Sequence, residues 1–115
     1  MKGESLTRLG EEQLASAKNA GSGRAAVTVF GGHEHDLRQT LIALAEGRSL
    51  GEHQAPGEAS LLVLRGRVRL RTADEEWEGD EGDYLVIPPD RHDLEAVTDA
   101  VVLLTVASRA STSQA

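Results

Sequence analysis

The spacing of apolar residues changes along the chain, from a helical period near its start to a period of two beyond residue 24. Apolar positions at helical spacing within residues 4–18 predict a short amphipathic helix, which Gly10 interrupts at a cost of about 1 kcal/mol relative to alanine. These positions are Leu6, Leu9 and Leu14. Residues 19–23, Asn-Ala-Gly-Ser-Gly, have the composition of a flexible linker.

The rest of the pattern is typical of short strands separated by glycine and proline turns. The apolar segments are residues 27–30, 37–45, 61–64, 67–71, 84–87 and 101–106. In residues 67–71 strict alternation places Val68 and Leu70 inside and the arginines in water, while the unbroken run at 61–64 suits a strand buried on both faces. Several strands of this length predict an all-β sandwich or small barrel.

The predicted elements divide the chain into three parts. Residues 1–24 hold the short helix and linker, and residues 25–107 hold the β domain. Residues 108–115 contain nothing to bury, so we expect a disordered tail. At 115 residues, a single domain is expected.

Charged residues gather in one stretch that allows two interpretations. Residues 74–83 carry seven carboxylates, and an arginine stripe at positions 65, 67, 69 and 71 precedes them. A cation site is one interpretation, but the spacing is not that of a calcium loop. A solvated hairpin whose carboxylates face the arginines is favoured, because opposite charges commonly pair on neighbouring strands.

Composition narrows the classes of partner. The net charge is −7 and only three residues are aromatic, which argues against nucleic-acid binding. No segment approaches the roughly 20 apolar residues of a membrane helix, so no membrane partner is expected. The absence of cysteine excludes thiolate chemistry and disulfides, and it suits a cytoplasmic protein.

Four histidines are the strongest candidates for site chemistry, because each lies at or beside the end of a predicted strand. They are His33, His35, His53 and His92. Neutral imidazole is the commonest protein ligand for transition metals, and His33 and His35 would point to one side of an extended segment. Each histidine taken alone is more often a surface or capping residue, so a site requires that several converge.

Two segments resemble the two conserved motifs of the cupins. Residues 47–66 resemble G-x5-H-x-H-x3,4-E-x6-G, and residues 82–92 resemble G-x5-P-x-G-x2-H. The matching positions are Gly47, His53, Gly66, Gly82, Pro88 and His92. The resemblance, to small single-domain bacterial cupins in particular, implies a double-stranded β-helix, a conical barrel of two antiparallel sheets. It also implies a ligand pocket inside the barrel, with metal held by histidines from the inner strands.

The chain departs from these motifs at the ligand positions. Ala55 stands in place of the second histidine and Ala59 in place of the glutamate, and Glu58 is one residue away. An offset of one residue on a strand turns a side chain to the opposite face. Asp90 replaces the glycine of the second motif, and His92 comes one residue early. We therefore expect a rebuilt site in which His33 or His35 joins His53 and His92.

These observations predict a small cupin-type barrel that binds a divalent metal, a small molecule or both, without assigned catalysis. The metal would be Zn, Fe, Mn, Ni or Cu, and the expected pocket residues are Glu58, Gln39 and Tyr84. Without metal, the histidines would be polar residues at the pocket mouth. The alternative is a metal-dependent enzyme, a dioxygenase or an isomerase, using the same site. A structural or regulatory role as a dimer platform is a third possibility.

A homodimer is expected, partly from the resemblance. The physical argument is that Trp77, among carboxylates, and the N-terminal leucines need covering, which a symmetric contact would supply. The competing interpretation is that Trp77 lies flat on its own sheet.

Overall fold

The computed structural model of the chain describes residues 1–55 and 57–107. Over these residues it shows a helix followed by a series of strands. The elements are α1 (Leu6–Asn19), β1 (Arg24–Phe30), β2 (Leu37–Leu44), β3 (Glu58–Arg65), β4 (Val68–Arg71), β5 (Glu76–Gly79), β6 (Tyr84–Val86), β7 (Asp93–Ala96) and β8 (Ala100–Ala107). The predicted tail at 108–115 lies outside the described residues.

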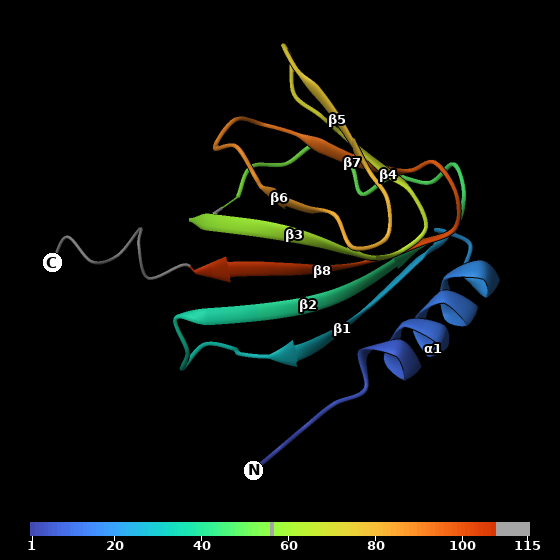
Figure 1. Ribbon diagram of the computed structural model, residues 1–115, viewed down its shortest axis with the longest axis vertical. Coiled ribbons are helices and arrows are strands. Elements are labelled where there is room, and N and C mark those ends of the chain that lie inside the picture. The colour runs from blue at the N-terminus through green and yellow to red at the C-terminus, as the bar shows by residue number, and fades with distance from the viewer. Residues whose placement is uncertain (56, 108–115) are drawn as a thin grey trace, which may run out of the picture.

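The strands form two antiparallel sheets that face each other. The larger has the order β1-β2-β8-β3-β6 and the smaller has the order β5-β4-β7 (Figure 1). The chain passes repeatedly from one sheet to the other, so each sheet contains strands from distant parts of the sequence. This architecture is the predicted double-stranded β-helix, a jelly-roll barrel with a short N-terminal helix.

Apolar side chains fill the space between the sheets. Alternate residues of β3 point inward, with Leu61 at 2% and Val63 at 1% exposure. From the smaller sheet Val68 and Leu70 meet them, as the alternation in residues 67–71 predicted. Fully burying a leucine or valine stabilises a fold by about 1.5–3 kcal/mol, so this core accounts for much of the stability of the barrel.

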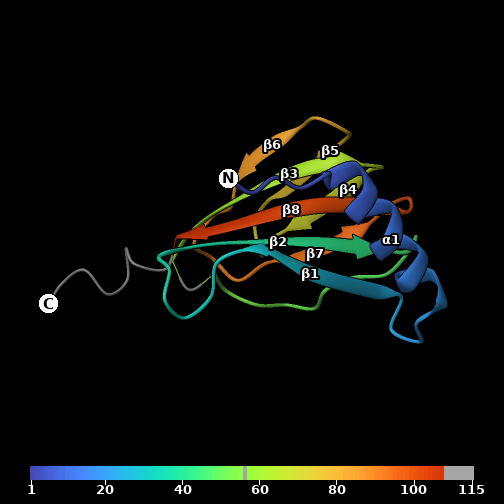
Figure 2. The ribbon, with the colours of Figure 1, turned by 90° about the horizontal axis from the view of Figure 1, so that it is seen from below.

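A second core joins α1 to the outer face of the larger sheet, which is its face away from the barrel. Leu14 and Ala17 pack against Leu41 and Val101, and α1 crosses the end of the sheet where β2 ends (Figure 2). Residues 20–23 connect α1 to β1 as a hydrogen-bonded turn. No helix in the described part of the chain is long and apolar enough to cross a membrane.

Trp77 and the leucines of α1 are covered by their own chain, so the expectation that a second protomer covers them is wrong. Trp77 packs against the barrel core of its own chain. The leucines of α1 pack on their own sheet. Neither group needs a second protomer to cover it.

The acidic run forms the expected hairpin with the arginine stripe. β5 pairs with β4, so that Glu78 lies opposite Arg69 and accepts from it at 2.8 Å. Hydrogen bonds from Arg69, and then from Arg67, lower the pKa of Glu78. Arg65 is the exception, because it lies on β3 in the other sheet.

Candidate functional site

His53 and His92 meet at one end of the barrel because an extended segment runs beside β7. Ser49 bridges to Glu95 and His53 bridges to His92, with backbone N–H···O distances of 2.9 and 2.8 Å between the two histidines. On its other side β7 pairs with β4, so the segment lies along the edge of the smaller sheet. The two imidazole rings stand edge to face, with centroids 4.6 Å apart.

Backbone carbonyl groups orient both rings in the same way. Nδ1 of His53 lies 3.0 Å from the carbonyl oxygen of Gly51, and Nδ1 of His92 lies 2.8 Å from that of Asp90. Because a carbonyl only accepts, each Nδ1 carries a proton and donates it. In the neutral imidazole, Nε2 then has a free lone pair, so the site presents two nitrogen acceptors.

Behind the two rings lies a small apolar cavity of about 20 Å³. Its wall combines the histidines with apolar side chains of both sheets and of the segments that connect their strands: Ile42, Leu50, Leu61, Leu70, Ile87, Leu94 and Leu104. His92 is only 3% exposed, whereas His53 is open to solvent. A cavity of this size takes about one water molecule, so a larger ligand has to bind from the mouth.

The histidines of the β1–β2 connection do not join this pair in a metal-binding group. His33 and His35 are exposed, and the His35 ring contacts Phe30, with centroids 4.8 Å apart. The described residues contain no group of three or more histidine, aspartate, glutamate or cysteine side chains that could hold a metal ion. The four-histidine ligand set therefore stays a prediction.

Glu58 faces away from the barrel, as its offset of one residue implies. It lines an outer groove together with Ser60 and Tyr84, while its neighbour Ala59 is buried in the barrel core. Ala55 also packs against that core. Both inward positions that the motif would fill with ligands thus carry methyl groups.

The other two expected pocket residues also lie outside the barrel. Tyr84 pairs with Leu62 in the register of β6 and β3, and it is 62% exposed on the outer face. Gln39 on β2 donates a hydrogen bond at 3.2 Å to Oγ1 of Thr105, the residue opposite it on β8. Glu58, Gln39 and Tyr84 therefore share one face of the larger sheet, away from the imidazole pair.

The donor set at the barrel mouth does not fit a resident metal ion of the kind that the motifs imply. A catalytic metal takes three protein ligands and an open position, and a structural zinc takes four. His53 and His92 supply two nitrogens, and no described carboxylate completes the set. An iron oxygenase needs two histidines and a carboxylate, which the outward direction of Glu58 does not provide.

Some features of the site had no signal in the sequence. The apolar wall of the cavity includes Leu50 and Leu104, which look like ordinary core leucines. The carbonyl groups of Gly51 and Asp90 set the tautomers, but any residue carries a carbonyl. Only the positions of the histidines relative to the motifs could be identified beforehand.

Comparison with known families and structures gives a consistent result. The family described as Cupin domain matches residues 40–107, more than half of the chain. A conserved protein of unknown function from Streptococcus pyogenes is similar at 25% identity and a TM-score of 0.71, over 92% of this chain and 86% of that one. No curated protein sequence matches.

Two cupin structures show the same architecture at lower coverage. An RmlC-like cupin from Desulfovibrio desulfuricans is 26% identical, with a TM-score of 0.64 over 74% of this chain and 82% of that one. A cupin superfamily protein from Desulfitobacterium hafniense is 18% identical, with a TM-score of 0.67 over 73% and 76%. The latter likeness concerns the fold alone.

Proposed function

The chain belongs to the cupin family, and on that premise we propose that it is a non-catalytic binding module for a small polar molecule. The ligand binds at the mouth of the barrel, between His53 and His92. The observation that carries the proposal is the contact of each Nδ1 with a backbone carbonyl oxygen, at 3.0 Å for His53 and 2.8 Å for His92. A ring that donates from Nδ1 keeps Nε2 as its acceptor when neutral.

The size and chemistry of the mouth limit the ligand. Behind the imidazoles the cavity holds about 20 Å³, so only a few atoms can enter the barrel. The cavity wall is apolar apart from the two histidines. A small molecule with hydrogen-bond donors at one end and a short apolar group at the other fits these surroundings.

A divalent transition metal at the same two nitrogens is the second candidate. Metal-bound histidines almost always donate their other ring N–H to a carboxylate or a carbonyl, as both rings do here. Because the chain offers two nitrogens, the remaining positions would have to come from a bound ligand. His33 and His35 would contribute only if the β1–β2 connection moved to the mouth.

Analysis of protein purified without an affinity tag distinguishes the small-molecule ligand from the metal ion. We would measure bound small molecules by native mass spectrometry and bound metal by elemental analysis, in the wild type, His53→Ala and the matched control His33→Ala. A small molecule lost in His53→Ala and kept in His33→Ala supports the proposal, and a metal with that pattern supports the second candidate. Protein that is empty, and that gains no thermal stability from millimolar small alcohols, amides and carboxylic acids, contradicts both.

We also propose that the protein acts as a homodimer, because large apolar side chains stay exposed on one face of the monomer. Its place in the cytoplasm stays a prediction from the cysteine-free composition.

A further inference from the structure

The segment that carries His53 contains a β-bulge beside β7. Two bridges fix its register, because Ser49 lies opposite Glu95 and His53 lies opposite His92. Between these bridges the segment spans five positions, whereas the chain beside it spans four. One extra residue on one side of an antiparallel pair is a bulge, which bends the strand and increases its twist.

The bulge explains why His53 lies in the wall of the barrel cavity. Leu50 and His53 both line that cavity, although they are three positions apart in the chain. On a regular strand, residues separated by an odd number of positions point to opposite faces. One extra residue between them returns the imidazole to the face that Leu50 occupies. The position of the proposed ligand site therefore depends on this bulge.

Gly51 supplies the unusual backbone of the bulge. Leu50 keeps the first register, because its N–H donates to the carbonyl oxygen of Leu94 at 3.0 Å. The extra residue therefore falls within residues 51–52, and Gly51 has φ +92°, a conformation that favours glycine. The carbonyl oxygen of Gly51 is also the group that lies 3.0 Å from Nδ1 of His53. The conformation of Gly51 thus determines whether that ring nitrogen meets an acceptor.

Asp93 fixes Gly51 from the opposite side of the pair. Its Oδ1 accepts a hydrogen bond from the N–H of Gly51 at 3.0 Å, which supplies an acceptor where the bulge interrupts the backbone ladder. Asp93 lies opposite Arg71 in the register of β4 and β7. The guanidinium of Arg71 nevertheless pairs with Glu95 and Glu76, at 2.9 and 3.0 Å. The carboxylate of Asp93 therefore supports the bulge rather than the row of ion pairs on the smaller sheet.

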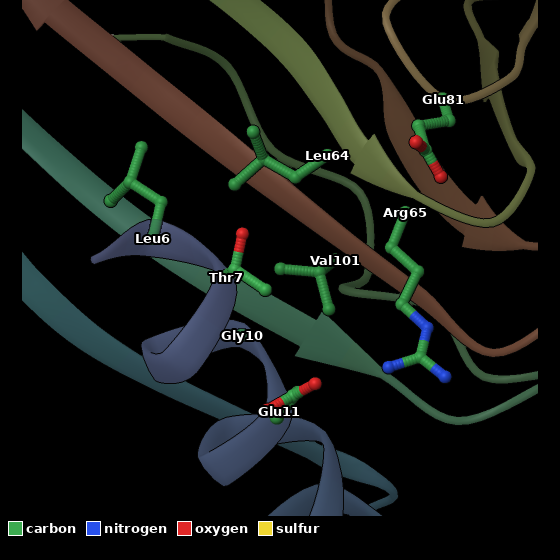
Figure 3. Close-up of a pocket in the computed structure, with 8 residues that line it drawn as sticks. All are labelled: Leu6, Thr7, Gly10, Glu11, Leu64, Arg65, Glu81 and Val101. Carbon is green, nitrogen blue, oxygen red and sulfur yellow. The ribbon is translucent and has the colours of Figure 1, made fainter.

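A cleft beside α1 takes no part in this arrangement. It lies between α1 and the ends of β3 and β8, and its volume is about 250 Å³ (Figure 3). The described residues that line it include no histidine, and Arg65 on its rim interacts electrostatically with Asp99. The groups that orient His53 are therefore those of the bulge.

We propose that Asp93 is a positioning residue for the ligand site, an inference that rests on the proposed function. Its carboxylate holds the N–H of Gly51, and the carbonyl group of Gly51 in turn holds Nδ1 of His53. Nε2 of His53 is thereby kept as an acceptor for the ligand. Asp93 acts through Gly51 and does not touch the ligand itself. In metal sites, the loss of such an outer partner typically costs about 10–100-fold in affinity or activity.

Long-range ¹H–¹⁵N NMR of the His53 ring tests this role without any ligand. Imidazole has an ordinary pKa of about 6.5, so spectra at about pH 8.5 report on the neutral form. We expect the wild type to carry its proton on Nδ1. In Asp93→Ala the acceptor for Nδ1 is no longer fixed, so both tautomers are populated and the two ¹⁵N shifts of His53 converge. The ring of His92, whose acceptor is the carbonyl oxygen of Asp90, should keep its shifts.

Three further variants separate this hydrogen bond from a general loss of structure. Asp93→Asn keeps an oxygen acceptor for Gly51, so we expect the wild-type shifts. Asp93→Val removes the acceptor with a side chain that suits a strand, so it repeats the test should Asp93→Ala fail to fold. The matched control is Gln54→Ala, which removes a hydrogen bond of 2.9 Å to the carbonyl oxygen of Pro89 and should leave His53 unchanged. Circular dichroism establishes that each variant is folded.

The outcomes distinguish the positioning role from the ligand site. A wild type in which neutral His53 carries its proton on Nε2 overturns both the role of Asp93 and the pair of acceptors on which the proposed function depends. A wild type protonated on Nδ1, with shifts unchanged in Asp93→Ala and Asp93→Val, overturns the positioning role alone. Equal changes in Asp93→Ala and in Asp93→Asn or Gln54→Ala also overturn it, because the effect would then not come from the acceptor at position 93.

Discussion

At the scale of single residues, Gly66 has the most constrained backbone between the two sheets. It ends β3 with φ +80°, a conformation that side chains with a Cβ rarely adopt. A Cβ at this position would collide with the carbonyl oxygen of Asp99 and lie 3.0 Å from Cα of Ala100. Since the obstacle is backbone, no rotamer change relieves it. Gly66, the last glycine of the first cupin motif, is therefore required because the backbone at the start of β8 passes directly beside it.

We predict that Gly66→Ala lowers the free energy of unfolding by about 2 kcal/mol or more. The left-handed conformation alone costs a residue with a Cβ about 1–2 kcal/mol, and the collision adds to it. Gly21→Ala is the control, because its Cβ would meet nothing within 4 Å. Urea unfolding measures both variants, and an equally small change in the two would refute the assignment of strain to Gly66.

The lack of a third metal ligand beside His53 and His92 can be tested by substituting Ala55. Ala55 is two positions after His53 and packs against the barrel core. Side chains two apart on an extended segment point to the same side. We predict that Ala55→His lowers the dissociation constant for Zn²⁺ at least ~10-fold by adding a third imidazole. In isothermal titration the control is Ala26→His, on the exposed side of β1; equal gains in both variants would contradict the two-donor account.

At the scale of elements, one carboxylate ties α1 to the β domain. Asp99, between β7 and β8, forms an ion pair with Lys18 at 2.9 Å and accepts from the backbone N–H of Glu46 at 2.8 Å. The hydrogen bond from Lys18, and then that from Glu46, lower the pKa of Asp99. The contact holds the end of α1 against the sheet that it covers.

The lowered pKa gives this contact a pH dependence. A depressed carboxylate pKa stabilises the fold at neutral pH, and that contribution is lost as pH falls below the ordinary aspartate value of about 3.9 and through the folded value. We predict that Asp99→Asn is less stable than the wild type at pH 7 and that the difference shrinks as the pH falls below about 4. Urea unfolding at a series of pH values measures it, with Asp74→Asn as the exposed control. A difference independent of pH would show that the ion pair contributes nothing.

The sequence predicts elements well where one face is buried and poorly where strands are short. The six apolar segments all correspond to strands. β5 was expected because its carboxylates could pair with the arginines of the neighbouring strand β4. β7 was missed, because Asp93–Ala96 has only Leu94 as a large apolar residue and depends on pairing with β4. The pairing of His53 with His92 is likewise non-local, so the spacing of residues alone could not predict it, whereas the resemblance to the two cupin motifs did.

The predicted pocket residues show the same limit. The offset argument correctly implied that Glu58 would turn away from the barrel, yet the sequence could not reveal that Gln39 and Tyr84 face the same way. Which face of a strand is inside depends on the register with its neighbours. That register is set by β8, which pairs with both β2 and β3 and is distant from them in sequence.

At the scale of the whole molecule, the barrel is a filled core with a polar opening at one end. Alanines occupy the inward positions where the motif would place ligands, and leucines and isoleucines leave a cavity of about 20 Å³. The chemistry that remains is concentrated in two imidazoles, one buried and one exposed. The proposed ligand site therefore depends on those two rings acting together, separately from His33 and His35 on the β1–β2 connection.

Long-range ¹H–¹⁵N NMR of the four imidazole rings, before and after addition of Zn²⁺ as a probe, tests this most directly. We predict that His53 and His92 are the Nδ1–H tautomer when neutral, and that their Nε2 resonances alone shift with Zn²⁺ while those of His33 and His35 stay in place. Rings of the Nε2–H tautomer at positions 53 and 92, or four rings that respond alike, would contradict the account.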